Sequence, residues 1–223
     1  MTDAHFLVIN PNSTASMTEK IAIAARQAGG AASRITAVNP EDGPAAIQGP
    51  EDGTAALPGL FKVFDQHIQN DPSIDAVIIA CFDDTGLFEL KERSPVPVIG
   101  IGEAAYHIAS VAAPKFSVVT TLSVSVPVLE HNLILNGLAA RCAKVRASDV
   151  AVLELEDPKS NARHKIENEI ATALQEDGIG AVALGCAGMA DLADDLSRKF
   201  QIPVIDGVAS AVRLAQALPL RNR

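Results

Sequence analysis

Short runs of aliphatic and β-branched residues alternate with longer amphipathic stretches along almost the whole chain. The short runs predict buried strands at 6–9, 34–38, 74–80 and 96–101, and then at 115–121, 142–146, 179–185 and 203–205. The amphipathic stretches predict helices at 15–28, 86–92, 103–112, 127–136, 162–176 and 208–218. Strands that alternate with helices in this way favour an α/β fold built on parallel sheets.

A stretch rich in Pro, Gly and Asp, from 39 to 59, interrupts this alternation. It predicts a long loop, and long loops inside compact domains are often lids or binding loops. A plain surface excursion is an equally good interpretation of the same composition.

Two cysteines occupy matching positions in the two halves of the chain. Cys81 follows strand 74–80 and Cys186 follows strand 179–185, and a Pro-Val-Ile segment comes 16 or 17 residues after each cysteine. The first strand of each half is also similar, so the order of elements runs twice. We interpret this pattern as an internal duplication.

The duplication predicts two pseudo-symmetric lobes, each a mainly parallel sheet flanked by helices, with the active site in the cleft between them. The first lobe is expected to cover 1–113 and the second 114–206. The last segment, 207–223, is expected to pack back onto the first lobe.

Composition indicates a well-packed globular protein. Of the 223 residues 48% are hydrophobic and 20% charged, and aromatic residues are few, so Ala, Val, Ile and Leu must form the core. The formal net charge of −9 disfavours nucleic acid or an anionic membrane as a partner, because both require basic surfaces. No apolar run reaches the roughly 18 residues of a membrane helix. Three cysteines without a secretory signal are typical of free thiols in a reducing compartment, so we expect a cytoplasmic protein.

The paired cysteines suggest acid/base chemistry. Ligands of parallel α/β sheets bind beyond the carboxyl ends of the strands, where Cys81 and Cys186 both fall. Each is expected to open the helix after its strand, where the positive end of the helix dipole lowers a thiol pKa. Two thiols facing each other can remove a proton from a carbon next to a carbonyl and return one to the opposite face. No metal or pyridoxal cofactor is needed if the substrate's own carbonyls spread the charge.

The cysteines have other interpretations. A single cysteine at the end of a buried strand is usually a small core residue, but equivalent positions in a repeat favour a functional pair. A disulfide between Cys81 and Cys186 is disfavoured in a reducing compartment. Cys142 lies outside the repeat and is interpreted as structural. The five histidines show no zinc-ligand spacing, so no metal site is predicted.

Two acids follow the first cysteine. Asp83 and Asp84 are interpreted as the N-cap and first-turn acids of the next helix. The functional alternative is a carboxylate that accepts a hydrogen bond from a substrate N–H.

Four segments of the chain resemble the hydantoin and allantoin racemases of the aspartate/glutamate racemase superfamily. They are Ile9–Thr14, Gly43–Ile47, Ala80–Gly86 and Leu184–Met189. The resemblance spans nearly the whole chain, and the two cysteine segments are its most specific parts. It implies a two-lobe α/β fold and a homo-oligomer, whether dimer, tetramer or hexamer. It also implies cofactor-independent racemisation with Cys81 and Cys186 as the catalytic acid and base.

The same resemblance, together with position at the strand ends, suggests which residues contact a small-molecule substrate. The expected substrate-binding residues are Asn10, Pro44, Ile47, Phe82, Asp83, Thr120, Thr121, Ala187 and Gly188.

One departure from the family pattern bears on the substrate. The family commonly has Phe-Gly-Asp-Pro-Gly after the first cysteine, whereas here Asp83 replaces the glycine and Thr85 the proline. Related enzymes that act on amino acids have more polar residues beside both cysteines, so a neutral 5-substituted hydantoin, with allantoin as one candidate, is favoured. The alternatives are another small carbonyl acid, as in aspartate/glutamate-type racemases, maleate isomerase or arylmalonate decarboxylase, and a non-catalytic two-lobe binding protein.

Overall fold

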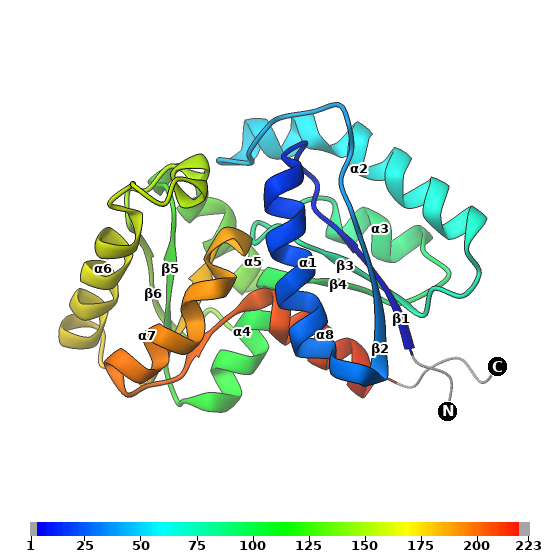
Figure 1. Cartoon of the computed structure of the whole chain (residues 1–223). Coiled ribbons are helices and arrows are strands. Elements are labelled where there is room, and N and C mark those ends of the chain that lie inside the picture. The colour runs from blue at the N-terminus through cyan, green and yellow to red at the C-terminus, as the bar shows by residue number, and fades with distance from the viewer. Residues whose placement is uncertain (1–3, 219–223) are drawn as a thin grey trace.

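Two four-stranded parallel sheets form the centres of two lobes (Figure 1). The computed structural model describes residues 4–218, so the ends of the predicted segments at 1–3 and 219–223 lie outside the described residues. The first sheet has the order β2-β1-β3-β4 and contains β1 (Ala4–Ile9), β2 (Ser33–Val38), β3 (Ala76–Ile79) and β4 (Val98–Gly100). The second has the order β6-β5-β7-β8 and contains β5 (Phe116–Thr120), β6 (Cys142–Ala147), β7 (Ala181–Gly185) and β8 (Val204–Ile205). The equivalent strand orders confirm the predicted α/β fold with two similar lobes.

Helices cover both faces of each sheet. They are α1 (Ala15–Gly29), α2 (Pro50–Asn70), α3 (Leu87–Arg93), α4 (Ile101–Ala112), α5 (Val126–Leu135), α6 (Ala162–Glu176), α7 (Ala193–Phe200) and α8 (Gly207–Ala217). Short 3₁₀ segments are η1 (Gly30–Ala32), η2 (Ser123–Ser125), η3 (Val152–Glu156) and η4 (Ala187–Leu192). Between residues 4 and 218 no helix has both the length and the apolar character that crossing a membrane requires.

The prediction of a loop through residue 59 is wrong, because α2 begins at Pro50. Proline is favoured in the first turn of a helix, where its missing N–H has no partner to lose, and Glu51 and Asp52 complement the helix dipole there. The internal Pro58 and Gly59 make this segment look irregular in the sequence. Gly59 serves packing, since an added Cβ would lie 2.9 Å from the Asp42 carbonyl oxygen. The true connection is therefore 39–49, and it packs directly on α2.

Side chains along the strands alternate between a shared core and a core private to each lobe. Phe6 faces the core that both lobes share, whereas Leu7 faces the core beneath α2 and α3. In the second lobe Val118 faces the shared core and Val119 the core beneath α6 and α7. Strands buried on both faces have nearly continuous apolar sequences, which explains the runs seen in this chain.

Helices α4 and α8 lie side by side between the two sheets (Figure 1). Their first turns are in close contact, because a Cβ added to Gly207 would lie 2.6 Å from the Ile101 carbonyl oxygen. Val212 of α8 is fully buried in the shared core, and Gln216 Nε2 donates to the Gly29 carbonyl at the end of α1 at 2.9 Å. Helix α8 thus follows the second lobe in sequence and packs on α1 of the first.

The N-terminus of α8 provides a test of how firmly this helix is held. The Asp206 carboxylate accepts hydrogen bonds from the N–H groups of Val208 and Ala209 at 2.9 and 2.8 Å. Asp206→Ala should lower the free energy of unfolding by about 1 kcal/mol or more, because both donors lose their partner. Urea denaturation followed by circular dichroism measures the change. Asp206→Asn keeps one acceptor oxygen and should lose less, and equal stability of wild type and Asp206→Ala would contradict the capping role.

Candidate active site

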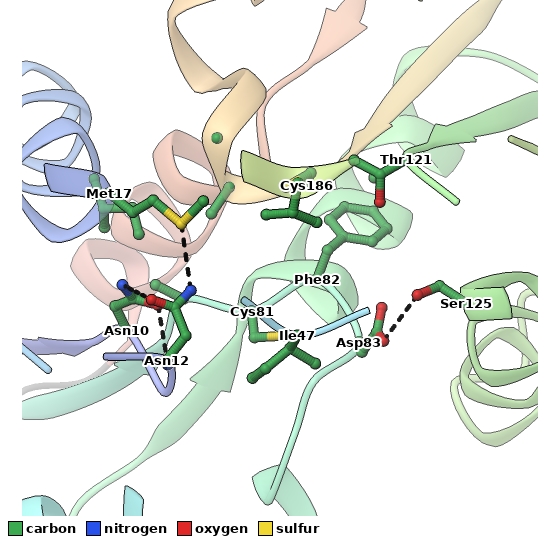
Figure 2. Close-up of a pocket in the computed structure, with 16 residues that line it drawn as sticks. Asn10, Asn12, Met17, Ile47, Cys81, Phe82, Asp83, Thr121, Ser125 and Cys186 are labelled. Atoms are coloured by element: carbon green, nitrogen blue, oxygen red, sulfur yellow. Dashed lines mark hydrogen bonds between the residues drawn. The ribbon is translucent and has the colours of Figure 1, made fainter. Parts of the chain in front are cut away.

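A small pocket lies at the carboxyl ends of the strands, and both lobes line it (Figure 2). Cys81 reaches it from the end of β3 and Cys186 from the end of β7, the equivalent strand of the second sheet. The lining residues are Asn10, Asn12, Met17, Ile21, Ile47, Ala80, Cys81, Phe82, Asp83, Thr121, Ser125, Val152, Gly185, Cys186, Ala187 and Gly188. The repeat in the sequence therefore brings the two like thiols into one cavity.

Cys81 lies in a tight turn rather than at the start of a helix. The Asp84 N–H donates to the Cys81 carbonyl at 3.0 Å, and α3 begins only at Leu87. The Thr85 hydroxyl donates to Cys81 Sγ at 3.4 Å. The expectation that Cys81 opens the next helix is therefore wrong, because a turn with Asp84 at φ 52° intervenes.

Cys186 does precede a helical segment. It is the residue before η4, and its carbonyl accepts from the Met189 N–H at 3.1 Å. The main chain of Gly188, in the first turn, lies beside the sulfur, because its N–H forms a hydrogen bond with Cys186. The main chain of Ala187 and Gly188 thus forms the wall beside the second thiol.

The surroundings raise the pKa of both thiols. Desolvation is the larger cause at each sulfur, and the negative charge of Asp83 adds to it. The pKa of Cys81 is raised well above its usual value, and that of Cys186 to about 12. The prediction that helix N-termini lower these pKa values is wrong, because removal from water outweighs the short η4 segment at Cys186 and no helix starts at Cys81. Both sulfurs are therefore thiols at neutral pH.

The two consecutive acids serve different purposes. The Asp84 carboxylate accepts from the Gly102 and Glu103 N–H groups at 3.0 and 2.7 Å, so it caps α4 instead of the helix that follows it. Asp83 points its carboxyl into the pocket, where Oδ2 accepts from the Ser125 hydroxyl at 3.2 Å (Figure 2). Burial raises the pKa of Asp83 to about 6. Asp84 is thus structural, and Asp83 is available to a ligand.

Asn12 was missed by the sequence analysis, although it follows the first strand in an Asn-Pro-Asn segment. The Asn10 amide donates to Asn12 Oδ1 at 2.9 Å and to the Thr18 hydroxyl at 3.0 Å, so both its hydrogens are taken. Asn12 Nδ2 donates only to Met17 Sδ, at 3.4 Å, and a thioether is a weak acceptor (Figure 2). Asn12 is therefore the better donor for a carbonyl oxygen, with Asn10 holding it in place.

Two of the expected substrate contacts lie outside the pocket. The Thr120 hydroxyl donates to the Gly185 carbonyl at 2.9 Å within the second sheet, so only the next residue, Thr121, lines the cavity. Pro44 accepts through its carbonyl from the Ser13 N–H at 3.0 Å and anchors the loop that carries Ile47. The other expected contacts all line the cavity, at Asn10, Ile47, Phe82, Asp83, Thr121, Ala187 and Gly188.

Polar contacts between two pairs of segments join the lobes beside the pocket. Gln48, from the loop before α2, accepts through Oε1 from the Val152 N–H of η3 at 3.0 Å. Lys20 of α1 donates to the Leu155 carbonyl at 3.0 Å and pairs with Glu156 at 2.8 Å. The pocket is partly open, and its volume is about 40 Å³, which is room for about three water molecules.

Comparison with known proteins places this geometry in a family. Residues 6–215 match the family model described as Asp/Glu/Hydantoin racemase. The chain is 44% identical over 214 residues to hydantoin racemase from Rhizobium meliloti, covering 96% of this chain and 88% of that one. Allantoin racemase from Klebsiella pneumoniae superposes with a TM-score of 0.93 at 40% identity, covering 97% and 87% of the two chains. Allantoin racemase from Pseudomonas fluorescens gives a TM-score of 0.89 at 39% identity, with 96% and 90% covered.

The chain belongs to the Asp/Glu/hydantoin racemase family. The predicted resemblance is confirmed, and so is the prediction of an enzyme of the racemase class, an isomerase. Within residues 4–218 no group of three or more His, Cys, Asp or Glu side chains converges in a way that could hold a metal ion.

The raised pKa of Asp83 predicts how the free energy of unfolding depends on pH. Its folded-state pKa of about 6 exceeds the ordinary 3.8, so the neutral carboxyl favours folding below pH 3.8 and this contribution is lost as the pH rises through about 6. The difference corresponds to about 3 kcal/mol at most. Asp83→Asn, which keeps an oxygen for Ser125, should therefore raise the free energy of unfolding at pH 7.5 and change it little at pH 4. Denaturation curves at the two pH values test this, and an equal effect at both would contradict it.

Proposed function

We propose that this protein is a cofactor-independent racemase of 5-substituted hydantoins, with allantoin among the candidate substrates. The observation that carries the proposal is the presence of Cys81 and Cys186 in one pocket, each at the end of the equivalent strand of its own lobe. The family membership and the hydantoin and allantoin racemases among its relatives support it.

In the proposed mechanism the two cysteines act on opposite faces of ring carbon 5. One thiolate takes the proton, so that an S–H bond forms as the C–H bond breaks, and the electron pair passes to the adjacent ring carbonyl. The thiol of the other cysteine then protonates the carbon from the far side and becomes the thiolate. The Asn12 amide and the main-chain N–H of Ala187 are the donors we assign to the carbonyl oxygen, whereas the Gly188 N–H is directed at Cys186 and favours its thiolate.

Each single replacement, Cys81→Ser or Cys186→Ser, is expected to lower the rate of enantiomer interconversion by about 10³-fold or more, because a serine hydroxyl is a far weaker acid than a thiol and neither ionises to serve as the base nor gives up its proton readily. Chiral chromatography of an enantiopure hydantoin measures the rate. Cys142→Ser is the matched control, since Cys142 lies on β6 outside the pocket, and it should retain full activity. Full activity in either Cys81→Ser or Cys186→Ser would refute the two-base scheme.

The raised thiol pKa values predict a pH dependence. Because the reaction needs one thiolate and both cysteines are thiols at neutral pH, kcat/KM should rise with pH between 7 and 8.5. The slope should approach about tenfold per pH unit, since the thiolate fraction grows in that proportion below the pKa. Deuterium exchange at carbon 5 in buffered heavy water, corrected for the uncatalysed rate, gives the profile. A flat profile would show that the thiolate is already formed at pH 7.

The same exchange experiment separates the enzyme from its alternatives. A decarboxylase of the arylmalonate type would release carbon dioxide, and a maleate isomerase would form fumarate. A glutamate-type racemase would exchange the α-proton of an amino acid, and a binding protein would exchange none.

We also propose a homo-oligomer, and light scattering of the purified protein measures its size.

A further inference from the structure

The carboxyl group of Asp83 lies in the pocket, and the proposed proton transfer does not use it. It lines the same cavity as Cys81 and Cys186, and Figure 2 shows it between the thiol region and Ser125. Of its neighbours in sequence, Phe82 lines the same pocket with an apolar ring and Asp84 does not line it. Phe82 packs edge-on against the buried Tyr106 ring at 5.4 Å, and Asp84 caps α4.

The main chain and side chain of Asp83 are both fixed by the second lobe. Asn132 of α5 donates through Nδ2 to the Asp83 carbonyl at 2.9 Å, and Ser125 donates to Oδ2 at 3.2 Å. Within residues 4–218 no lysine, arginine or histidine forms an ion pair with this carboxyl. The group is thus held in a defined position with one neutral donor and no counter-charge, which leaves the second oxygen to be satisfied by whatever occupies the cavity.

Electrostatics restricts where a substrate can meet this group. Proton removal places negative charge on a ring carbonyl oxygen, and a carboxylate beside that oxygen would oppose the reaction. Asp83 must therefore face a part of the substrate that donates hydrogen bonds. The ring N–H groups are common to all hydantoins and give no selection, whereas the substituent at carbon 5 differs between them.

We propose that Asp83 is the specificity-determining residue of the pocket. This inference rests on the proposed function. Asp83 accepts hydrogen bonds from N–H donors of a neutral substituent on the stereogenic carbon, of which a ureido group is the simplest example. An alkyl or aryl substituent of the same size leaves the carboxylate buried and unpaired, and a substituent with its own carboxylate is repelled. Sites built to bind a donor group reject the analogue that lacks it by up to about 10⁴-fold.

The decisive comparison uses two substrates of nearly the same shape. Allantoin carries a ureido group on carbon 5, and 5-isobutylhydantoin carries a branched alkyl group of the same number of non-hydrogen atoms. Deuterium exchange at carbon 5, followed by proton nuclear magnetic resonance in heavy water at pH 7.5, gives kcat/KM for each. We expect the wild type to prefer allantoin by about 10²-fold or more. Asp83→Ala should reduce this preference at least tenfold, chiefly by losing activity on allantoin.

Two further variants make the test independent of folding. Asp83→Asn keeps the acceptor for Ser125 but adds an amide donor and removes the charge, so it should lower the preference for allantoin in the same direction. Ser125→Ala releases Asp83 Oδ2 and should change the preference less than either. Circular dichroism and a thermal melt establish that each variant is folded.

The outcomes distinguish this inference from the proposed function. Absence of exchange for every hydantoin in the wild-type protein overturns the proposed function itself. Exchange in the wild type with an unchanged ratio of the two substrates in both Asp83 variants overturns only the specificity role, and so does a wild-type preference for 5-isobutylhydantoin. A ratio that falls in both Asp83 variants supports it.

Discussion

The hydrophobic core shared by the two lobes is the constraint on which the rest of the structure depends. One face of each sheet packs into it, from Phe6 on β1 to Val118 on β5, and helices α4 and α8 fill the space between. Because close-packed interiors deform little, this core fixes the distance and angle between the sheets. The carboxyl ends of β3 and β7 are thereby held at one pocket, and two residues that are 105 positions apart in the sequence share it.

Burial has opposite consequences for stability and chemistry at this pocket. Desolvation raises the pKa of Cys81, Cys186 and Asp83 alike, so each charged form is unfavourable where it stands. In the proposed mechanism a thiolate formed there is poorly solvated and therefore a strong base, as removal of a weakly acidic C–H proton requires. The uncompensated Asp83 carboxylate is a stability cost of a kind that proteins retain at functional sites.

The periodicity of the sequence predicted the strands, most helices and the paired cysteines, because these follow from local patterns that repeat. What it missed depends on contacts between distant segments. Helix α2 was not predicted because Pro58 and Gly59 are residues that usually interrupt helices. Gly59 is needed there because the loop before α2 packs against it. Asp84 caps a helix 18 residues further on, which no local rule indicates. Asn12 differs from Asn10 only in its hydrogen bonds: the Asn10 amide donates to side chains nearby, whereas the Asn12 amide has only a weak sulfur acceptor.

The return of the chain to the first lobe limits how the molecule can move. The polypeptide passes between the lobes once through α4 and again into α8, and the two helices are in direct contact at Gly207. A single crossing would leave the lobes free to turn about one connection, whereas two crossings packed against each other oppose that turning. The Gln48–Val152 and Lys20–Leu155 hydrogen bonds add further links between the lobes at the pocket. The lobes are thus joined by the chain itself at the helix pair and by separable hydrogen bonds at the pocket.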